Sequence, residues 1–215
     1  MGILNINVSL NNKIKINVNN LDCFYGKSKL PVFISNDEDK PRKQKENIYR
    51  SSVIIIVEHW KESKYLCLKS INRDYNSFIT GGIENDEKPS ESAIRELKEE
   101  TGYYDLKHVV DLNYYILNYF YAKFKDINKL VQYNIIYIKL NSGKKNKISK
   151  EESNKHVVQW VDSESVLDFL TSKSNIFAFN LINENKKNIL NNTINKIVIP
   201  KEVNKYLKDF YLTKQ

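Results

Sequence analysis

The chain has 215 residues, which is enough for one large domain or for one domain with additions at its ends. Apolar residues make up 41% of it, enough for a packed core, and its formal net charge is +8 at pH 7. No apolar run approaches the roughly 20 residues that a membrane helix needs, so no membrane span is expected. The positive charge favours polyanionic partners, but it also follows from a chain rich in Lys, Asn and Ile throughout.

The N-terminus and the cysteines argue against further classes of protein. Residues 1–5 lack the basic-then-apolar layout of a secretory signal, and Ile6 stands where N-myristoylation requires Ser or Thr. The two cysteines, Cys23 and Cys67, give no disulfide framework, and Cys67 lies in an apolar run, as a small buried residue would. A reducing, cytoplasmic setting is therefore expected.

The first 45 residues are expected to lie outside the main domain. Residues 6–10 and 14–18 alternate apolar and polar side chains around an Asn-Asn pair, which predicts a β-hairpin. The highly charged segment 35–47 is typical of a solvated linker. We therefore expect an N-terminal hairpin extension and linker at residues 1–45.

The core is expected to lie at residues 46–175. The sequence predicts strands at residues 52–57, 64–69, 106–124, 131–140 and 157–161, with 106–124 and 131–140 antiparallel to each other. A basic loop is expected at residues 143–150.

Three helices are expected, one in the middle of the chain and two towards its end. The first begins near Pro89, which suits a first helical position. Ser163 is a candidate N-cap for a second helix that runs to about Leu170. The C-terminal extension at residues 176–215 is expected to contain an Asn-rich segment and a helix from Lys201 to Leu212.

A cluster of glutamates near residue 100 carries the main functional signal. Glu96, Glu99 and Glu100 are three and four residues apart, which places them on one face of a helix. Gly102 follows, as a glycine does at a helix C-terminus, so the acids occupy the last turn. Mutual repulsion and the helix dipole each oppose this cluster by about 0.2–0.5 kcal/mol. A bound Mg²⁺ or Mn²⁺ would offset both effects, because these ions prefer carboxylate and water oxygens.

The segment 81–103 resembles the Nudix box, G-x5-E-x7-R-E-U-x-E-E-x-G-U, where U is a bulky apolar residue. The chain matches every fixed position, with Gly81, Glu87, Arg95, Glu96, Leu97, Glu99, Glu100, Gly102 and Tyr103. The resemblance implies an α/β fold, the α/β/α sandwich of Nudix proteins with a mixed β-sheet. It also implies metal-dependent hydrolysis of a pyrophosphate bond in a nucleoside diphosphate linked to another group.

The same resemblance implies roles for the acids of the box. Glu96, Glu99 and Glu100 match the metal-binding acids of the family, and a backbone carbonyl of Thr80 or Gly81 would complete the metal shell. A metal ion would neutralise the phosphates and lower the pKa of a bound water. Glu96 is also a candidate for activating that water, although in this family the activating acid sometimes lies on another loop.

The other residues of the box are expected to support these acids. Arg95 would pair with acids of the box and orient them, and Glu87 lies at the helix entrance. Gly81 and Gly82 permit a tight turn and a close approach of the backbone to the metal, and Gly102 ends the helix.

Two positions depart from the usual pattern of the box. Asp86 stands where many relatives have glycine, which could alter the turn. Lys88 stands where Ser or Thr often caps the helix, which weakens the cap by about 0.5–2 kcal/mol. Neither departure removes a metal ligand.

Outside the box, several residues have both a functional and a structural interpretation. Glu151 and Glu152 are candidates for a further acid at the metal, or they form a solvated pair. Arg50 and Arg73 are candidate phosphate contacts or solvated arginines. The aromatic stretch at residues 114–121 could stack a base, or it could pack the core. The three histidines are expected to be ordinary surface or strand-end residues.

Three functions remain open from the sequence. The first is hydrolysis of a nucleotide sugar, ADP-ribose, a dinucleoside polyphosphate or a modified nucleoside triphosphate. The second is removal of pyrophosphate or a cap from RNA 5′ ends, favoured by the net charge and the lysines at residues 144–150. The third is a non-catalytic nucleotide sensor, which is disfavoured because the chain retains every acid of the box. The terminal extensions could also form a homodimer or bind a partner.

Overall fold

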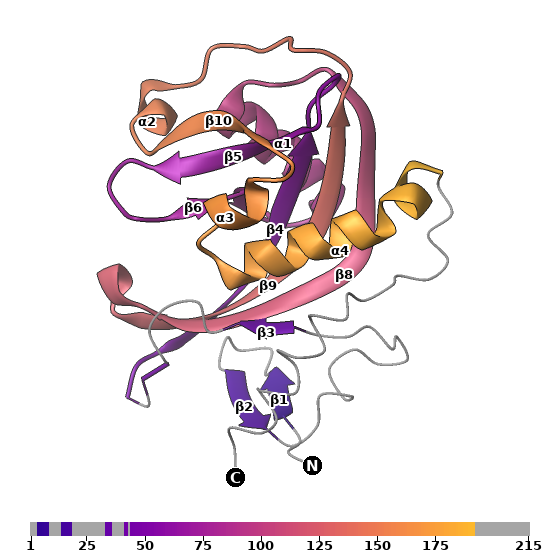
Figure 1. The fold of residues 1–215 in the computed structure, drawn as a ribbon. Coiled ribbons are helices and arrows are strands. Elements are labelled where there is room, and N and C mark those ends of the chain that lie inside the picture. Colours follow the sequence, from indigo (N-terminus) through magenta and orange to yellow (C-terminus); the bar gives the residue numbers. More distant parts are fainter. Residues whose placement is uncertain (1–3, 9–13, 19–32, 36–40, 43, 192–215) are drawn as a thin grey trace.

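The computed structural model describes residues 4–8, 14–18, 33–35, 41–42 and 44–191. An eight-stranded mixed sheet forms the centre, with α3 and α4 in front of it and α1 behind it in the view of Figure 1. The strands are β1 (Leu4–Val8), β2 (Ile14–Val18), β3 (Phe33–Ser35), β4 (Asn47–Glu58), β5 (Lys64–Ser70), β6 (Asn76–Ser77), β7 (Ile79–Gly82), β8 (Leu106–Ala122), β9 (Ile127–Leu140) and β10 (His156–Asp162). The α-helices are α1 (Pro89–Thr101), α2 (Lys150–Ser153), α3 (Val166–Phe169) and α4 (Lys173–Leu190), and a 3₁₀ turn spans Lys123–Lys125.

The sheet has the strand order β10-β5-β4-β9-β8-β3, with β6 paired to β5 and β7 paired to β4. β4 runs parallel to β9 and antiparallel to β5 and β7, so the sheet is mixed as predicted. Gly81 and Gly82 do not form the predicted tight turn but are the last residues of β7, and the pairing of Gly81 with Val53 fixes them at the centre of the sheet. The predicted antiparallel pairing of β8 with β9 is confirmed.

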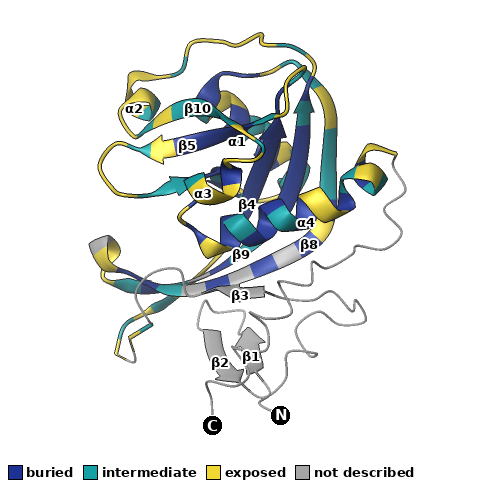
Figure 2. Cartoon of the chain, in the orientation of Figure 1, coloured by how far each residue is buried: buried dark blue, intermediate teal, exposed yellow. Residues whose placement is uncertain are grey.

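Each face of the sheet contributes a separate hydrophobic cluster. Side chains alternate between the two faces of a strand. Val53, Ile55 and Val57 therefore pack towards α1, while Ile54 and Ile56 pack towards α4. All five are fully buried, and β4 is dark blue along most of its length in Figure 2. The uninterrupted β-branched run is explained by burial on both faces.

The helix of the box forms as predicted, despite its two unusual residues. Asp86 adopts a left-handed backbone with φ of 65°, the conformation that glycine would adopt most easily. Lys88 supplies no side-chain cap, but its backbone N–H donates to the Glu91 carboxylate at 2.9 Å. The helix ends at Gly102, whose φ of 81° is left-handed, and the Gly102 N–H donates to the carbonyl of Lys98.

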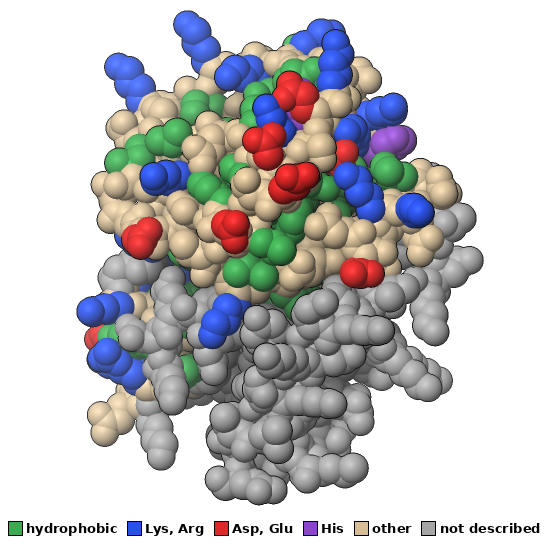
Figure 3. Space-filling view, viewed as in Figure 1, with side chains coloured by type: hydrophobic (Ala, Val, Ile, Leu, Met, Phe, Trp, Pro, Cys, Tyr) green, Lys and Arg blue, Asp and Glu red, His purple; other side chains and the backbone are tan. Residues whose placement is uncertain are grey.

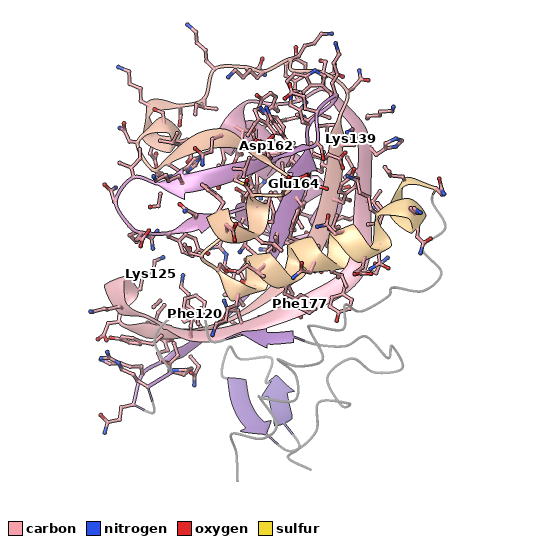
Figure 4. All side chains as sticks on the ribbon, in the orientation of Figure 1. Phe120, Lys125, Lys139, Asp162, Glu164 and Phe177 are labelled. Carbon is pink, nitrogen blue, oxygen red and sulfur yellow. The ribbon has the colours of Figure 1, made fainter. Side chains whose placement is uncertain are left out.

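The helix α4 was not predicted, because its asparagines lower its helix propensity. It is stabilised by packing, since six apolar side chains on it are buried: Phe177, Ala178, Phe179, Leu181, Ile182 and Ile189. Phe177, labelled in Figure 4, lies against β8, where its ring centroid is 5.8 Å from that of Tyr114. The buried Asn175 accepts a hydrogen bond from the Phe78 N–H at 2.8 Å. The domain boundary expected at residue 175 falls inside this helix.

A buried carboxylate connects α4 to three strands. Glu58 accepts hydrogen bonds from Tyr137 and Lys139 at 2.7 Å each, and Lys186 of α4 lies 2.8 Å from it. Lys186 also donates to the Tyr65 hydroxyl at 3.1 Å. Burial alone would raise the pKa of Glu58, but the hydrogen bonds from Lys139 and Lys186 hold it below its ordinary value. Glu58 is therefore ionised, and Lys139 and Lys186 balance its charge.

Two of the predicted segments are corrected by the structure. The second helix begins at Val166 with Ser165 as its N-cap, and Ser163 belongs instead to a turn. The Ser163 N–H donates to the Ser63 carbonyl, which holds this residue beside β5. The basic loop is also shorter than expected, because α2 begins at Lys150. The short strand β3, parallel to β8, was not predicted.

The terminal extensions are described only in part. β1 and β2 pair antiparallel, with Ile6 opposite Ile16, so the predicted hairpin is confirmed. Its turn, residues 36–40 and 43 of the predicted linker and the predicted helix from Lys201 to Leu212 lie outside the described residues. Among the helices that the structure describes, none is long and apolar enough to cross a membrane.

The contact between Glu58 and Lys186 yields a prediction about stability. Lys186→Gln removes one of two cations from a buried carboxylate, which should lower the free energy of unfolding by about 1–3 kcal/mol. Lys187→Gln changes a neighbouring exposed lysine of the same helix and should shift it by about 0.5 kcal/mol or less. Urea unfolding at pH 7 measures both, and equal midpoints for the two variants would refute this role of Lys186.

Candidate active site

Arg95 joins the turn before α1 to the acids on the helix. Its Nε and Nη2 atoms donate to the two carboxylate oxygens of Glu87 at 3.0 Å each, so the pair is bidentate. Nη2 also donates to the Gly82 carbonyl at 2.8 Å. The Ser92 hydroxyl donates to the same carbonyl at 3.0 Å. These bonds hold the end of β7 and the Glu87 side chain against α1.

The same guanidinium holds two of the three predicted metal ligands. Arg95 Nη1 lies 2.8 Å from Glu96 Oε1 and 3.2 Å from Glu99 Oε2. The hydrogen bond from Arg95 lowers the pKa of Glu87, and the acids in turn raise the pKa of Arg95 above its ordinary value. Arg95 is therefore a fixed positive charge among three carboxylates.

Gly81 is packed directly against Glu96. A Cβ atom at position 81 would lie 2.0 Å from Cγ and Cδ of Glu96, so a side chain there would displace the carboxylate. The Glu96 side chain is only 14% exposed, and burial raises its pKa. On the neighbouring residue, a Cβ atom at Gly82 would meet the guanidinium of Arg50 at 2.0 Å. Neither glycine has an unusual φ, and a side chain at either position would displace the Glu96 or Arg50 side chain from its place in the site.

Glu100 has the most unusual environment of the acids. Its Oε2 atom is buried and has no hydrogen-bond partner. Burial, helped by the nearby charges of Glu96 and Glu152, raises the pKa of Glu100 to about 8. A buried carboxylate oxygen without a donor is costly, so this position suits a cation.

The structure separates the two candidate acids of α2. Glu152 is 22% exposed and close enough to Glu100 to affect its pKa, whereas Glu151 is 81% exposed. Both acids pair with Lys155, at 2.7 Å from Glu152 and 3.0 Å from Glu151. The structure therefore brings Glu152, and not Glu151, to the acids of the box.

In the described part of the chain, no group of three or more His, Cys, Asp or Glu side chains is arranged as a ready metal site. Glu96 and Glu99 are instead turned towards the guanidinium of Arg95. Glu99 is on the exposed side of α1, so its side chain is free to turn away from Arg95. The donor set, with the unpartnered oxygen of Glu100, nevertheless fits a hard divalent cation.

A small cavity of about 100 Å³ opens beside Gly81 at the end of β7. Its charged residues are Arg50 and Lys129, and Phe120 and Tyr133 supply aromatic rings. It is completed by Ser52, Thr80, Gly81 and Val131. Lys129 and Tyr133 were not identified from the sequence, because only the register of β9 beside β4 brings them to Arg50. Phe120, labelled in Figure 4, comes from the aromatic stretch of β8.

Most of the other candidate residues lie away from the proposed site and make contacts within the fold. Tyr114 is buried in the core, and Tyr121 donates to Asp126. Arg73 does not line the cavity that contains Arg50. His59 is buried and stacked on Trp60, with ring centroids 3.6 Å apart, and burial lowers its pKa. His156 differs, since its Nε2 atom lies 3.3 Å from the backbone carbonyl of Glu100.

Comparisons with known proteins agree with this geometry. A family model described as the NUDIX domain matches residues 48–181. A structure described as a NUDIX hydrolase from Listeria monocytogenes is 27% identical, with a TM-score of 0.52, and the match covers 66% of this chain and 95% of that one.

A second solved structure shows the same fold at lower identity. The Escherichia coli dihydroneopterin triphosphate pyrophosphohydrolase is 16% identical, with a TM-score of 0.50, and the match covers 72% of this chain and 99% of that one. A search of the curated proteins finds no match. Because the family match spans more than half of the chain and includes the whole box, the protein belongs to the Nudix family and is a pyrophosphohydrolase.

Proposed function

We propose that this protein hydrolyses a pyrophosphate bond in a nucleoside diphosphate linked to another group, with Mg²⁺ or Mn²⁺ held by Glu96, Glu99 and Glu100. The observation that carries the proposal is the buried, unpartnered Oε2 atom of Glu100 beside the second buried acid, Glu96. Two such acids repel each other and disfavour ionisation unless a cation lies between them. Nudix hydrolases generally use divalent cations, so the donor set and the family agree.

Some residues of the site are proposed to bind the metal, and others to hold those ligands in position. When bound, the metal would neutralise the phosphates and make the attacking water more acidic. Glu96 is the acid that we propose to orient or deprotonate that water, because its side chain is mostly buried and lies directly beside Gly81. Arg95 positions Glu96 and Glu99, and Glu87 positions Arg95. The carbonyl of Gly81 is the backbone ligand that we propose.

Glu152 is the additional acid that we propose for the metal site. It stands across from the last turn of α1 on the short helix α2, whose N-cap is the Ser149 hydroxyl, which accepts from the Glu152 N–H at 3.1 Å. This cap fixes the start of α2 and hence the place of Glu152. Lys155 balances its charge while the site lacks a cation.

The substrate is proposed to meet the chain at the cavity beside Gly81. Arg50 and Lys129 supply positive charge for a phosphate, while Phe120 and Tyr133 offer flat apolar surface to a base or sugar. A nucleotide sugar, ADP-ribose, a dinucleoside polyphosphate and a modified nucleoside triphosphate all combine these two features.

The buried free thiol of Cys67 is consistent with a reducing, cytoplasmic setting.

An RNA 5′ end is the second candidate substrate. It is favoured by the net charge of +8 and by four lysines within residues 144–150 that form no ion pair in the described chain.

A non-catalytic sensor is disfavoured, because every acid of the box is present. The extensions at residues 1–45 and 176–215 are proposed to contribute substrate choice or self-association, and α4 would stay with the catalytic domain in any truncation.

The metal ligands are tested by replacing single acids. Glu99→Gln and Glu100→Gln should each lower turnover by about 100-fold or more, because the lost stabilisation is several kcal/mol. Glu91→Gln, on the exposed first turn of the same helix, should leave turnover within about twofold. Phosphate release is measured over a nucleotide panel with Mg²⁺ and Mn²⁺. Retained activity in both Glu99→Gln and Glu100→Gln would refute the ligand assignment.

The role of Glu152 has a matched control in its neighbour. Glu152→Gln should lower kcat by about 10–100-fold, as expected for loss of an outer metal contact. Glu151→Gln removes an acid that pairs with the same lysine, and it should leave kcat within about twofold. Equal effects in the two variants would show that Lys155, rather than the metal, explains any loss.

The RNA alternative is tested by salt dependence. If 5′-triphosphorylated RNA is bound along the basic surface, log kcat/KM should fall with log salt concentration with a slope of about −0.7 for each phosphate contacted. A small nucleotide makes few phosphate contacts, so its slope should be shallower. Equal slopes for RNA and for a nucleotide such as ADP-ribose would argue against RNA as the substrate.

A further inference from the structure

A second and larger cavity lies on the α1 side of the sheet, away from Arg50 and Gly81. Its volume is about 590 Å³. Leu66 and Val158 form its floor on β5 and β10, and Tyr103 and Trp160 form an aromatic wall. The other wall is the segment 145–148, which belongs to the connection between β9 and α2 along the top of Figure 1. The mechanism proposed above makes no use of this cavity.

The aromatic wall is held by its neighbours. The Trp160 Nε1–H donates to the Tyr103 hydroxyl at 3.2 Å, and the ring centroids are 5.7 Å apart. Trp60 packs edge-on against Trp160 at 5.9 Å and is itself stacked on His59. Because these contacts fix both rings, the wall is already formed for a flat ligand.

The wall opposite is basic. Residues 141–150 contain four lysines and no acid, and Lys145 and Lys147 line the cavity. Neither lysine forms an ion pair within the part of the chain that the structure describes, and the Lys145 ammonium lies 5.7 Å from the centre of the Tyr103 ring. Figure 3 shows lysine and arginine side chains projecting along the top of the view, where this connection runs. The cavity thus pairs an aromatic surface with uncompensated positive charge.

The basic wall is attached to the end of α1. The Asn146 N–H donates to the Gly102 carbonyl at 2.9 Å, and Lys145 forms a β-bridge with Tyr103. A Cβ atom at Gly102 would meet the Asn146 carbonyl oxygen at 2.2 Å. The close approach shows that the segment 145–148 has a defined place over the sheet. The cavity is therefore a built feature rather than a space under a loose loop.

We propose that this cavity is a second ligand site, which binds a purine nucleoside monophosphate. Its volume falls within the range of about 300–1,000 Å³ typical of small-molecule sites. A purine would lie against Tyr103 and Trp160, and stacking of this kind contributes about 1–3 kcal/mol for each base. The phosphate would meet Lys145 and Lys147. None of Glu96, Glu99 and Glu100 lines it, so the site does not share the proposed metal ligands, although Thr101, which follows Glu100, lies in its wall.

Tryptophan fluorescence can report ligand binding at this site. Its two tryptophans are Trp60 and Trp160, and they are in contact with each other at the cavity wall. We expect AMP to change the tryptophan fluorescence of the full chain in a saturable way, with excess EDTA present to keep metal away from the box. Adenosine and inorganic phosphate, each offering half of the ligand, should bind about 10-fold or more weakly than AMP.

Paired variants then test the position of the site. The double variant Lys145→Gln, Lys147→Gln should raise the Kd for AMP by about 10-fold or more. The control Lys144→Gln, Lys150→Gln removes the same charge from the same segment at positions outside the cavity, and it should change the Kd by about twofold or less. A fluorescence response that is absent at millimolar AMP, or equal losses in the two double variants, would overturn the proposal.

A third variant separates this site from the catalytic site. The double variant Glu99→Gln, Glu100→Gln should lose phosphate release but keep the fluorescence response to AMP with unchanged Kd. If that variant loses the response, AMP binds at the box and the second site is refuted. If the response persists while wild-type protein hydrolyses no nucleotide, the second site stands and the proposed catalytic function fails.

Discussion

The ion pairs of Arg95 are the interaction on which the rest of the site depends. One guanidinium contacts Glu87, Glu96 and Glu99 and also donates to the carbonyl of Gly82. It thereby connects the turn that follows β7 to the last half of α1, where like charges would otherwise separate. One cation does not balance all of these acids, and the buried oxygen of Glu100 lies outside its reach. The ion pairs stabilise the folded arrangement, but the acids carry more negative charge than Arg95 balances, and a metal ion would offset the remainder.

The pairing of strands in the sheet fixes the positions of the residues in this network. β7 pairs with the central strand β4, so Gly81 is held opposite Val53 and its backbone presses against Glu96. The parallel pairing of β4 with β9 brings Lys129 and Tyr133 towards Arg50. On the other face, Glu58 and Lys186 attach α4 to the same strands. The three box acids proposed as metal ligands are therefore carried by one helix, α1, that packs on the paired strands β4 and β7.

The parts of this structure that the sequence predicted are those with local signals. The spacing of Glu96, Glu99 and Glu100 and the glycine after them defined α1, and the β-branched run defined β4. α4 was missed because its asparagines oppose helix formation and only tertiary contacts such as that of Asn175 stabilise it. The choice between Glu151 and Glu152 depends on the cap of α2, and the two cavities are built from residues on separate strands. No periodicity in the sequence reports such long-range pairing.

The central claim is that a divalent cation occupies the position beside the unpartnered oxygen of Glu100 and turns Glu96 and Glu99 towards itself. It is tested most directly by anomalous diffraction from crystals grown with Mn²⁺. We predict one strong anomalous peak within bonding distance of carboxylate oxygens of Glu96, Glu99 and Glu100, at about 2.0–2.3 Å. Saturating Mn²⁺ with no peak there, and with Glu96 and Glu99 still paired to Arg95, would contradict the account.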